Sequence, residues 1–173
     1  MLEDQTIRLR ALEPEDLDVL MRWENDADSW QVGNTLAPYS RYALRQYLEQ
    51  SVEDLYTTRE LKLVIVHKAS GESIGLIDLF HFDPHHRRIE LGVLVDAAWR
   101  RQGVATAAVR LALEYALDFL HLHQVYCLVE ENNTASRDML LAAGLTQGGV
   151  WRDWLHCGDG YHHAVMLQKI NSL

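Results

Sequence analysis

The stretch that decides the fold is VLVDAAWRRQGVAT, residues 93–106. An apolar strand-like run leads through a short loop into a segment whose apolar residues recur at helical spacing. The first backbone amides of a helix lack helical partners and that end is partly positive, so it binds phosphate well. Gly103 lets an anion approach the backbone, and Ala105 keeps the next turn small. The side chains of Arg100 and Arg101 could add charge-assisted bonds to a pyrophosphate.

This stretch does not match either of two common nucleotide-binding motifs. The P-loop pattern G-x-x-x-x-G-K-[ST] is absent, and only one glycine of the Rossmann fingerprint can be placed. Taken alone, a strand, an arginine pair and a glycine also fit an ordinary strand-to-helix turn with solvated arginines. The rest of the chain has to decide between these alternatives.

Outward from this stretch, the pattern of apolar residues predicts a mixed sheet. Alternating or continuous apolar runs predict strands at residues 6–12, 61–67, 73–82, 89–95, 124–130, 149–155 and 161–168. Helical spacing predicts helices at residues 14–26, 40–56, 101–120 and 134–143. Pro14 and Ser40 are suited to helix starts, and Gly144 is suited to follow the last helix. This order indicates an α/β fold, and because no linker or repeat interrupts it, residues 1–173 are expected to form one domain.

Composition narrows the class of protein. The formal net charge of −9 disfavours a nucleic-acid binder, which normally carries a basic patch. The charge is compatible with a cationic small-molecule substrate, although many cytosolic proteins are acidic for solubility alone. No apolar run approaches the roughly 20 residues that span a bilayer, and the acidic N-terminus is not a secretory signal. We therefore expect a cytoplasmic protein with no membrane contact and no nucleic-acid partner.

Cysteine and histidine usage gives no sign of a disulfide scaffold or a metal centre. Cys127 lies in an apolar strand and is expected to be buried, whereas Cys157 lies in a turn. The nine histidines include adjacent pairs, but no set of cysteines, histidines and carboxylates has a metal-ligand spacing. We therefore expect no metal site.

The motif at residues 100–105 resembles the signature [R/Q]-x-x-G-x-[G/A] of the GNAT acetyltransferase superfamily, with Arg100, Gly103 and Ala105 at its fixed positions. The resemblance extends over nearly the whole chain. It includes IRLR at 7–10, PEDL at 14–17, SIGL at 73–76, HRRIELG at 86–92, ENNTAS at 131–136 and AGL at 143–145. Within the superfamily, the chain is most similar to the branch of spermidine and diamine acetyltransferases and ribosomal-protein N-terminal acetyltransferases.

The resemblance implies a fold and a cosubstrate. The fold is a mixed, mostly antiparallel sheet of about seven strands with four helices, splayed between the fourth and fifth strands. Acetyl-CoA would place its pantetheine arm in the splay, held by the backbone of Val93, Leu94 and Val95 and by Asn133. The residues implied for the pyrophosphate are Arg100, Arg101, Gln102, Gly103, Val104, Ala105 and Thr106. Many members of the superfamily are dimers, so a homodimer is compatible with this assignment.

The resemblance also implies transfer of acetyl to a primary amine, which must lose a proton before it attacks. Glu90 is the expected base, directly or through water, and Asp78 and His81 are lesser candidates. A structural alternative is that Glu90 is a strand glutamate paired with Arg87, Arg88 or another surface charge. A strand N–H near Leu94 could stabilise the tetrahedral oxyanion.

The general acid is where the chain departs from the family. Polyamine acetyltransferases usually have a tyrosine four residues before the glycine that follows this helix, and that position is Leu140 here. Leucine cannot protonate a thiolate. Either Ser136 supplies a hydroxyl, as serine does in the ribosomal-protein branch, or water protonates the thiolate. Ser136 could also be no more than a polar residue in a helical first turn.

The acceptor itself is not determined by the sequence. A polyamine, a peptide N-terminus, an amino sugar or an antibiotic amine would fit, and the alternative class is a catalytically weak acyl-CoA-binding or regulatory module. Aromatic and acidic residues in the first helical region could receive a cationic amine, or could be core packing. They are Trp23, Glu24, Asp26, Asp28, Trp30, Tyr39, Tyr42 and Tyr47.

Overall fold

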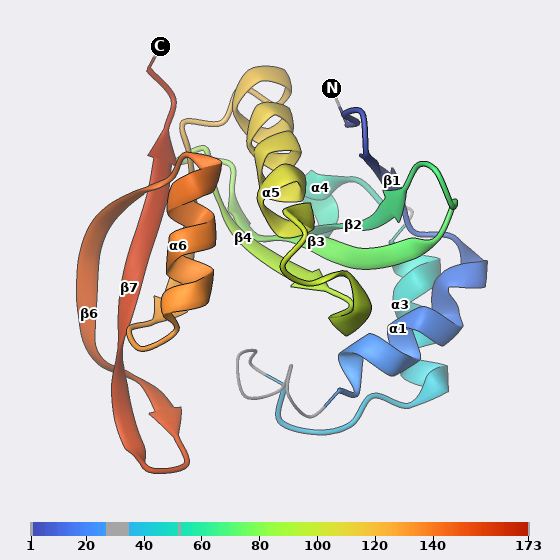
Figure 1. Cartoon of the computed structure of the whole chain (residues 1–173), viewed down its shortest axis with the longest axis horizontal. Coiled ribbons are helices and arrows are strands. Elements are labelled where there is room, and N and C mark those ends of the chain that lie inside the picture. Colours follow the sequence, from blue (N-terminus) through green and yellow to red (C-terminus); the bar gives the residue numbers. More distant parts are fainter. Residues whose placement is uncertain (1, 27–34, 52, 173) are drawn as a thin grey trace.

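The computed structural model describes residues 2–26, 35–51 and 53–172. It contains one seven-stranded sheet in the order β1-β2-β3-β4-β5-β7-β6 (Figure 1). The strands are β1 Ile7–Ala11, β2 Leu61–His67, β3 Ser73–Asp83, β4 Arg88–Val95, β5 Gln124–Glu130, β6 Thr146–Cys157 and β7 Gly160–Ile170. Neighbouring strands are antiparallel except β4 and β5, which are parallel. The expected mixed, mostly antiparallel sheet is confirmed.

The described residues contain five α-helices. They are α1 Leu17–Glu24, α3 Arg41–Gln50, α4 Leu55–Thr58, α5 Val104–Glu114 and α6 Thr134–Ala143. A 3-10 turn at Pro14–Asp16 precedes α1, and a π-helical turn at Tyr115–Phe119 continues α5. As expected, Ser40 caps α3, where its hydroxyl accepts a bond from the Ala43 N–H, and Gly144 follows α6 with a φ of 107°.

The expected single helix over residues 40–56 is wrong. α3 ends at Gln50, and a separate short helix begins after Asp54. The Asp54 carboxylate accepts bonds from the N–H groups of Tyr56 and Thr57, so it starts a new helix instead of continuing the old one. This division accounts for five helices in place of the expected four. Val52, expected on the apolar face of that helix, lies outside the described residues.

The sheet is covered on both faces. α5 and α6 lie side by side over one face, while α1 and α3 lie together on the other (Figure 1). The larger core is formed under α5 and α6, with Ala108 and Ala112 of α5 fully buried. The smaller core joins Leu20 and Leu44 of α1 and α3 to the far face of β2 and β3. No helix in the described ranges is long and apolar enough to cross a bilayer.

A bidentate ion pair joins the first strand to the turn before α1. Both guanidinium Nη atoms of Arg10 bind the Asp16 carboxylate, at 2.7 and 2.8 Å. The Asp16 side chain is only 5% exposed and also accepts the Glu13 N–H. Burial alone would raise the pKa of Asp16, but the bonds from Arg10 and Glu13 outweigh it and hold this pKa below the usual range.

Asp16→Asn is expected to lower the free energy of unfolding by about 2 kcal/mol at pH 7, less than for a fully buried pair because Arg10 is partly exposed. A carboxyl group whose pKa is lower in the folded than in the unfolded state stabilises the fold fully at any pH above the pKa of the unfolded state. This stabilisation is lost as the pH falls through the pKa of the folded state. The difference in free energy of unfolding between wild type and variant, measured by urea titration, should therefore become smaller below about pH 4. Asp18→Asn, which removes the exposed Arg41 pair, is the control. A gap that stays constant with pH would contradict this assignment.

Candidate active site

The central feature of the site is a slot between β4 and β5. The two strands pair only at Arg88 with Gln124, Ile89 with Val125 and Glu90 with Tyr126. Beyond this third rung the parallel strands separate, and residues 92–94 of β4 are half-buried although β4 is central in the sheet. The splay expected between the fourth and fifth strands is therefore present, and it opens towards the carboxyl ends of both strands.

A cysteine lies where the two strands begin to separate. The next rung would pair Leu91 with Cys127, but the Cys127 thiol donates to the Leu91 carbonyl instead, at 3.0 Å. Burial raises the pKa of Cys127 to about 12, so the thiol keeps the proton that it donates. The sequence predicted a buried residue here but gave no sign of this role, because the contact joins residues 36 positions apart.

The loop before α5 leaves backbone amides without helical partners at the mouth of the slot. Arg101 and Gly103 have positive φ values of 60° and 80°, which turn the chain sharply into the helix. The Gly103 carbonyl accepts its bond from the Ala107 N–H, so the amides of residues 104–106 precede the first helical bond. This geometry fits an anion site formed by backbone N–H groups.

Side chains of the same loop hold it in place. Arg100 Nε donates to the Val95 carbonyl at 3.0 Å, and Gln102 Nε2 donates to the Ala98 carbonyl at 3.0 Å. Arg100 was expected to contribute charge to a pyrophosphate, and part of its guanidinium instead joins the loop to the end of β4. The Val104 side chain lies in the core, so this residue can offer only its amide to a ligand.

Asp96, which follows β4, joins the loop to α1. Its carboxylate accepts bonds from Trp23 Nε1 and Arg22 Nη2, both at 2.9 Å, and from the Ala98 N–H. The Trp23 bond is the largest of the effects that lower the pKa of Asp96. Trp23 is therefore a buried anchor for the loop, which agrees with the core-packing alternative for this residue.

Two predicted site residues meet at the start of α6. The Asn133 side-chain oxygen accepts the Ser136 N–H at 3.1 Å and caps the helix. Leu140, at the position where polyamine acetyltransferases have tyrosine, is only 3% exposed and belongs to the larger core. A tyrosine at position 140 would have to be accommodated in that packed core.

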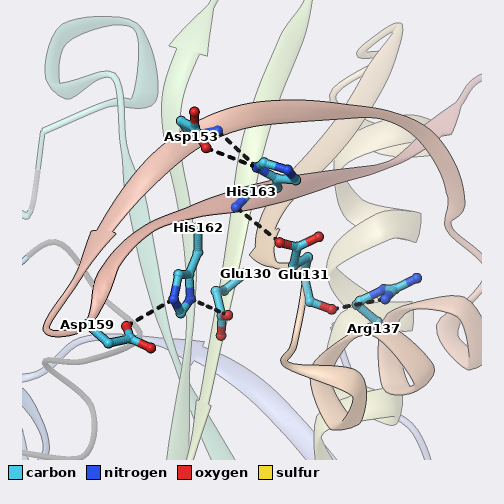
Figure 2. A network of polar contacts seen from close by, with 7 residues as sticks. All are labelled: Glu130, Glu131, Arg137, Asp153, Asp159, His162 and His163. Atoms are coloured by element: carbon cyan, nitrogen blue, oxygen red, sulfur yellow. Dashed lines mark hydrogen bonds and ion pairs between the residues drawn. The ribbon is translucent and has the colours of Figure 1, made fainter.

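A polar network joins the start of α6 to the hairpin of β6 and β7 (Figure 2). His163 accepts the Asp153 backbone N–H through its ring atom Nδ1 at 3.0 Å. The backbone N–H of His163 donates to the Glu131 carboxylate at 3.5 Å. The Glu131 carbonyl accepts from Arg137 Nη1 of α6 at 3.0 Å. The hairpin therefore helps to position the turn that carries Asn133.

A second group of side chains in Figure 2 lies at the end of β5. His162 of β7 contacts Glu130 through Nδ1 at 2.8 Å and Asp159 through Nε2 at 2.9 Å. The hydrogen bond to the Glu130 carboxylate raises the pKa of His162. Along β5, Val125, Cys127 and Val129 point into the larger core, so Glu130 lies on the opposite face of the sheet.

Glu90 lies on the same face as Glu130, at the last paired rung before the slot. Its neighbours Ile89 and Leu91 point into the larger core, so Glu90 points towards the side of α1 and α3. Its side chain is 12% exposed, and its oxygen Oε2 is 2.9 Å from His81 Nδ1.

The structural alternative for Glu90 is a pair with Arg87, Arg88 or another surface charge, and the two arginines are not its partners. Arg87 binds the His121 carbonyl, and Arg88 pairs with Asp83 at 3.2 Å. The exposed His81 contacts Glu90 instead, and this contact is an ion pair, as the third option of the alternative allows, only when the ring is protonated.

Asp78, the other carboxylate considered as a base, belongs to a buried ion cluster. Lys62 Nζ lies 2.6 Å from Glu24 and 2.9 Å from Asp78, and 5.8 Å from the centre of the Tyr47 ring. Burial opposes the charge of Lys62, but the two carboxylates raise its pKa, so the ammonium stays charged. Part of the acidic and aromatic region expected to receive an amine thus binds the chain's own lysine.

The remaining aromatic residues of that region are distributed differently. Tyr39 and Tyr42 are exposed. Trp30 and Asp28 lie outside the described residues. In the part of the chain that the structure describes, no group of three or more histidines, cysteines and carboxylates is arranged to hold a metal ion.

A family model described as "Acetyltransferase (GNAT) domain" matches residues 6–146. The chain therefore belongs to the GNAT acetyltransferase family, as the resemblance predicted. It is an enzyme that transfers the acetyl group of acetyl-CoA to an amine.

Relatives and solved structures agree with this assignment. The chain is 26% identical to spermidine N(1)-acetyltransferase of Escherichia coli K12 over 94% of this chain and 84% of that protein. A putative ribosomal N-acetyltransferase of Bacillus subtilis is 31% identical over 58% of this chain and 54% of that protein.

Two solved structures share the fold. Spermidine N-acetyltransferase of Vibrio cholerae, in complex with CoA and spermine, has a TM-score of 0.87 at 22% identity, with 98% of each chain covered. A ribosomal-protein-S5-alanine acetyltransferase of Vibrio fischeri has a TM-score of 0.83 at 18% identity, with 98% of this chain and 96% of that chain covered.

Gly103→Ala is expected to weaken acetyl-CoA binding without unfolding the protein. A Cβ at this position meets nothing within 4 Å, so the variant carries only the strain of a positive φ, about 1 kcal/mol. Relief of that strain should turn the loop amides away from their present directions. Gly71→Ala is a matched control, because Gly71 also has a positive φ and open space but lies in the hairpin between β2 and β3. Calorimetric titration with acetyl-CoA should separate the two variants, and equal affinities would contradict the anion site.

Proposed function

We propose that this acetyltransferase acts on a small polycationic amine of the polyamine or diamine class, with Glu90 as the base. The observation that carries this proposal is the position of Glu90. Its carboxylate is largely buried at the last rung before the slot opens, on the face of the sheet opposite the larger core. A base placed there could reach an amine that approaches from that face while acetyl-CoA occupies the slot.

The acceptor class is supported by charge. Glu130 and Asp159 lie beyond Glu90 on the carboxyl side of β5 and share one histidine, His162, so the group stays net negative even when this ring is charged. The chain as a whole has a net charge of −9. Carboxylates on one face raise the local concentration of cations. A polyamine could place one amine at Glu90 while a second charged amine lies near these acids. The relative from Escherichia coli K12 is a spermidine acetyltransferase.

The backbone around the slot would hold acetyl-CoA. Backbone groups of Val93, Leu94 and Val95 would bind the pantetheine amides where they face the slot and not β3, apart from the Val95 carbonyl, which already accepts Arg100 Nε. Asn133 would lie on the opposite wall. The amides from Arg101 to Thr106, together with the Arg100 and Arg101 side chains, would bind the pyrophosphate.

The reaction then follows in three steps. Glu90 takes a proton from the ammonium, and the free amine attacks the thioester carbonyl. A backbone N–H near Leu94 stabilises the tetrahedral oxyanion. Collapse of this intermediate breaks the C–S bond and expels the thiolate, which takes a proton from the Ser136 hydroxyl or from water. The nitrogen, which still carries one proton more than the neutral amide, gives that proton to the serine oxygen or hydroxide left behind, so that N-acetylated amine and CoA thiol are formed and Glu90 holds the remaining proton.

Two other acceptor or function classes have specific observations in their favour. A peptide N-terminus is favoured by Ser136 and by the ribosomal-protein acetyltransferase relatives. A catalytically weak acyl-CoA-binding module is favoured by Leu140, which offers a core methyl group where a hydroxyl is usual. Homodimer formation and a cytoplasmic location stay predictions of the sequence.

The first test is release of CoA, followed with a thiol reagent, over a panel of polyamines, diamines, amino acids, peptides, amino sugars and aminoglycosides. Turnover is expected on polyamines or diamines. Turnover on peptides alone would replace the proposed acceptor. Acetyl-CoA binding in calorimetry without turnover on any amine would favour the binding module.

Glu90→Gln is expected to lower kcat about 100-fold at low pH and much less at high pH. At low pH nearly all of the amine is protonated and needs a base, whereas at high pH free amine is available without one. The pH–rate profile of the acetyl transfer measures this. Glu72→Gln, which changes an exposed carboxylate in the hairpin between β2 and β3, is the control. An unchanged profile for Glu90→Gln would remove Glu90 from the mechanism.

A further inference from the structure

The backbone of β3 is irregular beside Glu90. The β3–β4 register runs from the pair Phe80 and Glu90 to the pair Asp83 and Arg88, so β3 has one extra residue in this interval. His81 occupies this bulge with a positive φ of 51°, which is uncommon for a residue other than glycine. Such strain persists only where surrounding contacts hold it, and it is often found at functional sites.

The bulge changes the direction of the His81 side chain. Phe80 and Glu90 are register partners on one face, so regular alternation would turn the next residue of β3 towards the other face. His81 Nδ1 instead lies 2.9 Å from Glu90 Oε2. The irregular backbone therefore brings an imidazole into contact with a carboxylate that a regular strand would keep apart.

The two partners differ in their exposure to solvent. The Glu90 side chain is 12% exposed and the His81 side chain is 67% exposed. A proton on Glu90 is thus largely shielded from water, while the ring that touches it is open to water. Imidazole is the side chain best suited to accept and release a proton near neutral pH.

We propose that His81 carries to solvent the proton that Glu90 takes from the acceptor amine. This inference rests on the proposed role of Glu90 as the base. After the amine has lost its proton, the O–H of the Glu90 carboxyl group passes its proton to Nδ1 of neutral His81. The imidazolium releases its Nε2 proton to water or buffer. Proton exchange of the exposed ring with solvent, or a flip of the ring, makes Nδ1 an acceptor again.

The neighbouring groups do not offer a competing route. Arg88 and Asp83 pair with each other at 3.2 Å, so their charges largely cancel. Burial raises the pKa of Tyr126 on β5, with further contributions from the negative charge of Glu90 and from a hydrogen bond to its carboxylate, so the phenol keeps its own proton and does not accept one from Glu90. The Phe80 ring packs edge-on against the His81 ring, with centroids 4.9 Å apart, and holds its orientation without titrating.

The test is His81→Asn in the full chain, with turnover measured in dilute buffer and again with added imidazole. Asparagine tolerates a positive φ, so the bulge should be retained. In dilute buffer kcat should fall about tenfold, a smaller loss than for the base itself, with KM for the amine unchanged. Added imidazole should restore much of the loss. His85→Asn changes an exposed histidine in the next turn and should behave as wild type at both buffer strengths.

A purely structural role for His81 predicts a different result. If His81 only orients Glu90, the loss in kcat will not respond to imidazole, and that outcome overturns the relay. An unchanged kcat in His81→Asn overturns it as well. The double variant with Glu90→Gln should be no slower than Glu90→Gln alone, because the relay acts only through Glu90; an additive loss contradicts it.

Failure of the relay is distinguishable from failure of the proposed function. Turnover by wild type together with either adverse result for His81→Asn removes the relay and leaves the acetyltransfer mechanism standing. No turnover by wild type on any amine of the panel removes Glu90 as the base, and the relay with it.

Discussion

The loss of pairing between β4 and β5 after their third rung is the constraint on which the site depends. Antiparallel pairing with β3 along Glu90–Val95 fixes β4 on its other side, so the backbone facing the slot cannot turn away. Unpaired N–H and C=O groups in the middle of a sheet are costly unless something binds them. At the narrow end the Cys127 thiol satisfies the Leu91 carbonyl, and at the wide end Arg100 Nε satisfies the Val95 carbonyl. The backbone groups between these two points are the ones that acetyl-CoA would bind under the proposed function.

The walls of the slot are held by contacts between distant parts of the chain. On one side, Asp96 joins the loop before α5 to Trp23 of α1, and Arg100 joins the same loop to the end of β4. On the other side, the hairpin network of Figure 2 positions the turn that Asn133 caps. Because each wall is fixed separately, acetyl-CoA would enter a site whose donors already point in useful directions, which reduces the cost of ordering them on binding.

The face of the sheet across from the larger core has two different acidic regions. Around Lys62, the carboxylates of Glu24 and Asp78 are neutralised by a buried ammonium, so this region contributes stability and not free negative charge. Around the slot, the basic side chains that contact Glu90 and Glu130 within the described residues are histidines: His81 contacts Glu90, and His162 contacts Glu130. An imidazole is in general a less permanent countercharge than an ammonium. The pKa of His162 is raised by its bond to Glu130, so this histidine holds its charge to a higher pH than usual, while the second carboxylate beside it, Asp159, leaves the group with a net negative charge.

The sequence by itself determined the elements and the motif. Residues 61–67, 124–130 and 134–143 fold with the expected bounds, and Ser40 and Gly144 act as expected, because apolar period and capping are local. The prediction of one helix over residues 40–56 was wrong for a local reason, because Asp54 caps a new helix there. Tertiary structure alone decided that Cys127 lies at the narrow end of the slot, that Leu140 is core and that His81 contacts Glu90. These features depend on strand register and on a bulge, and the alternation of side chains along one strand contains no information about either.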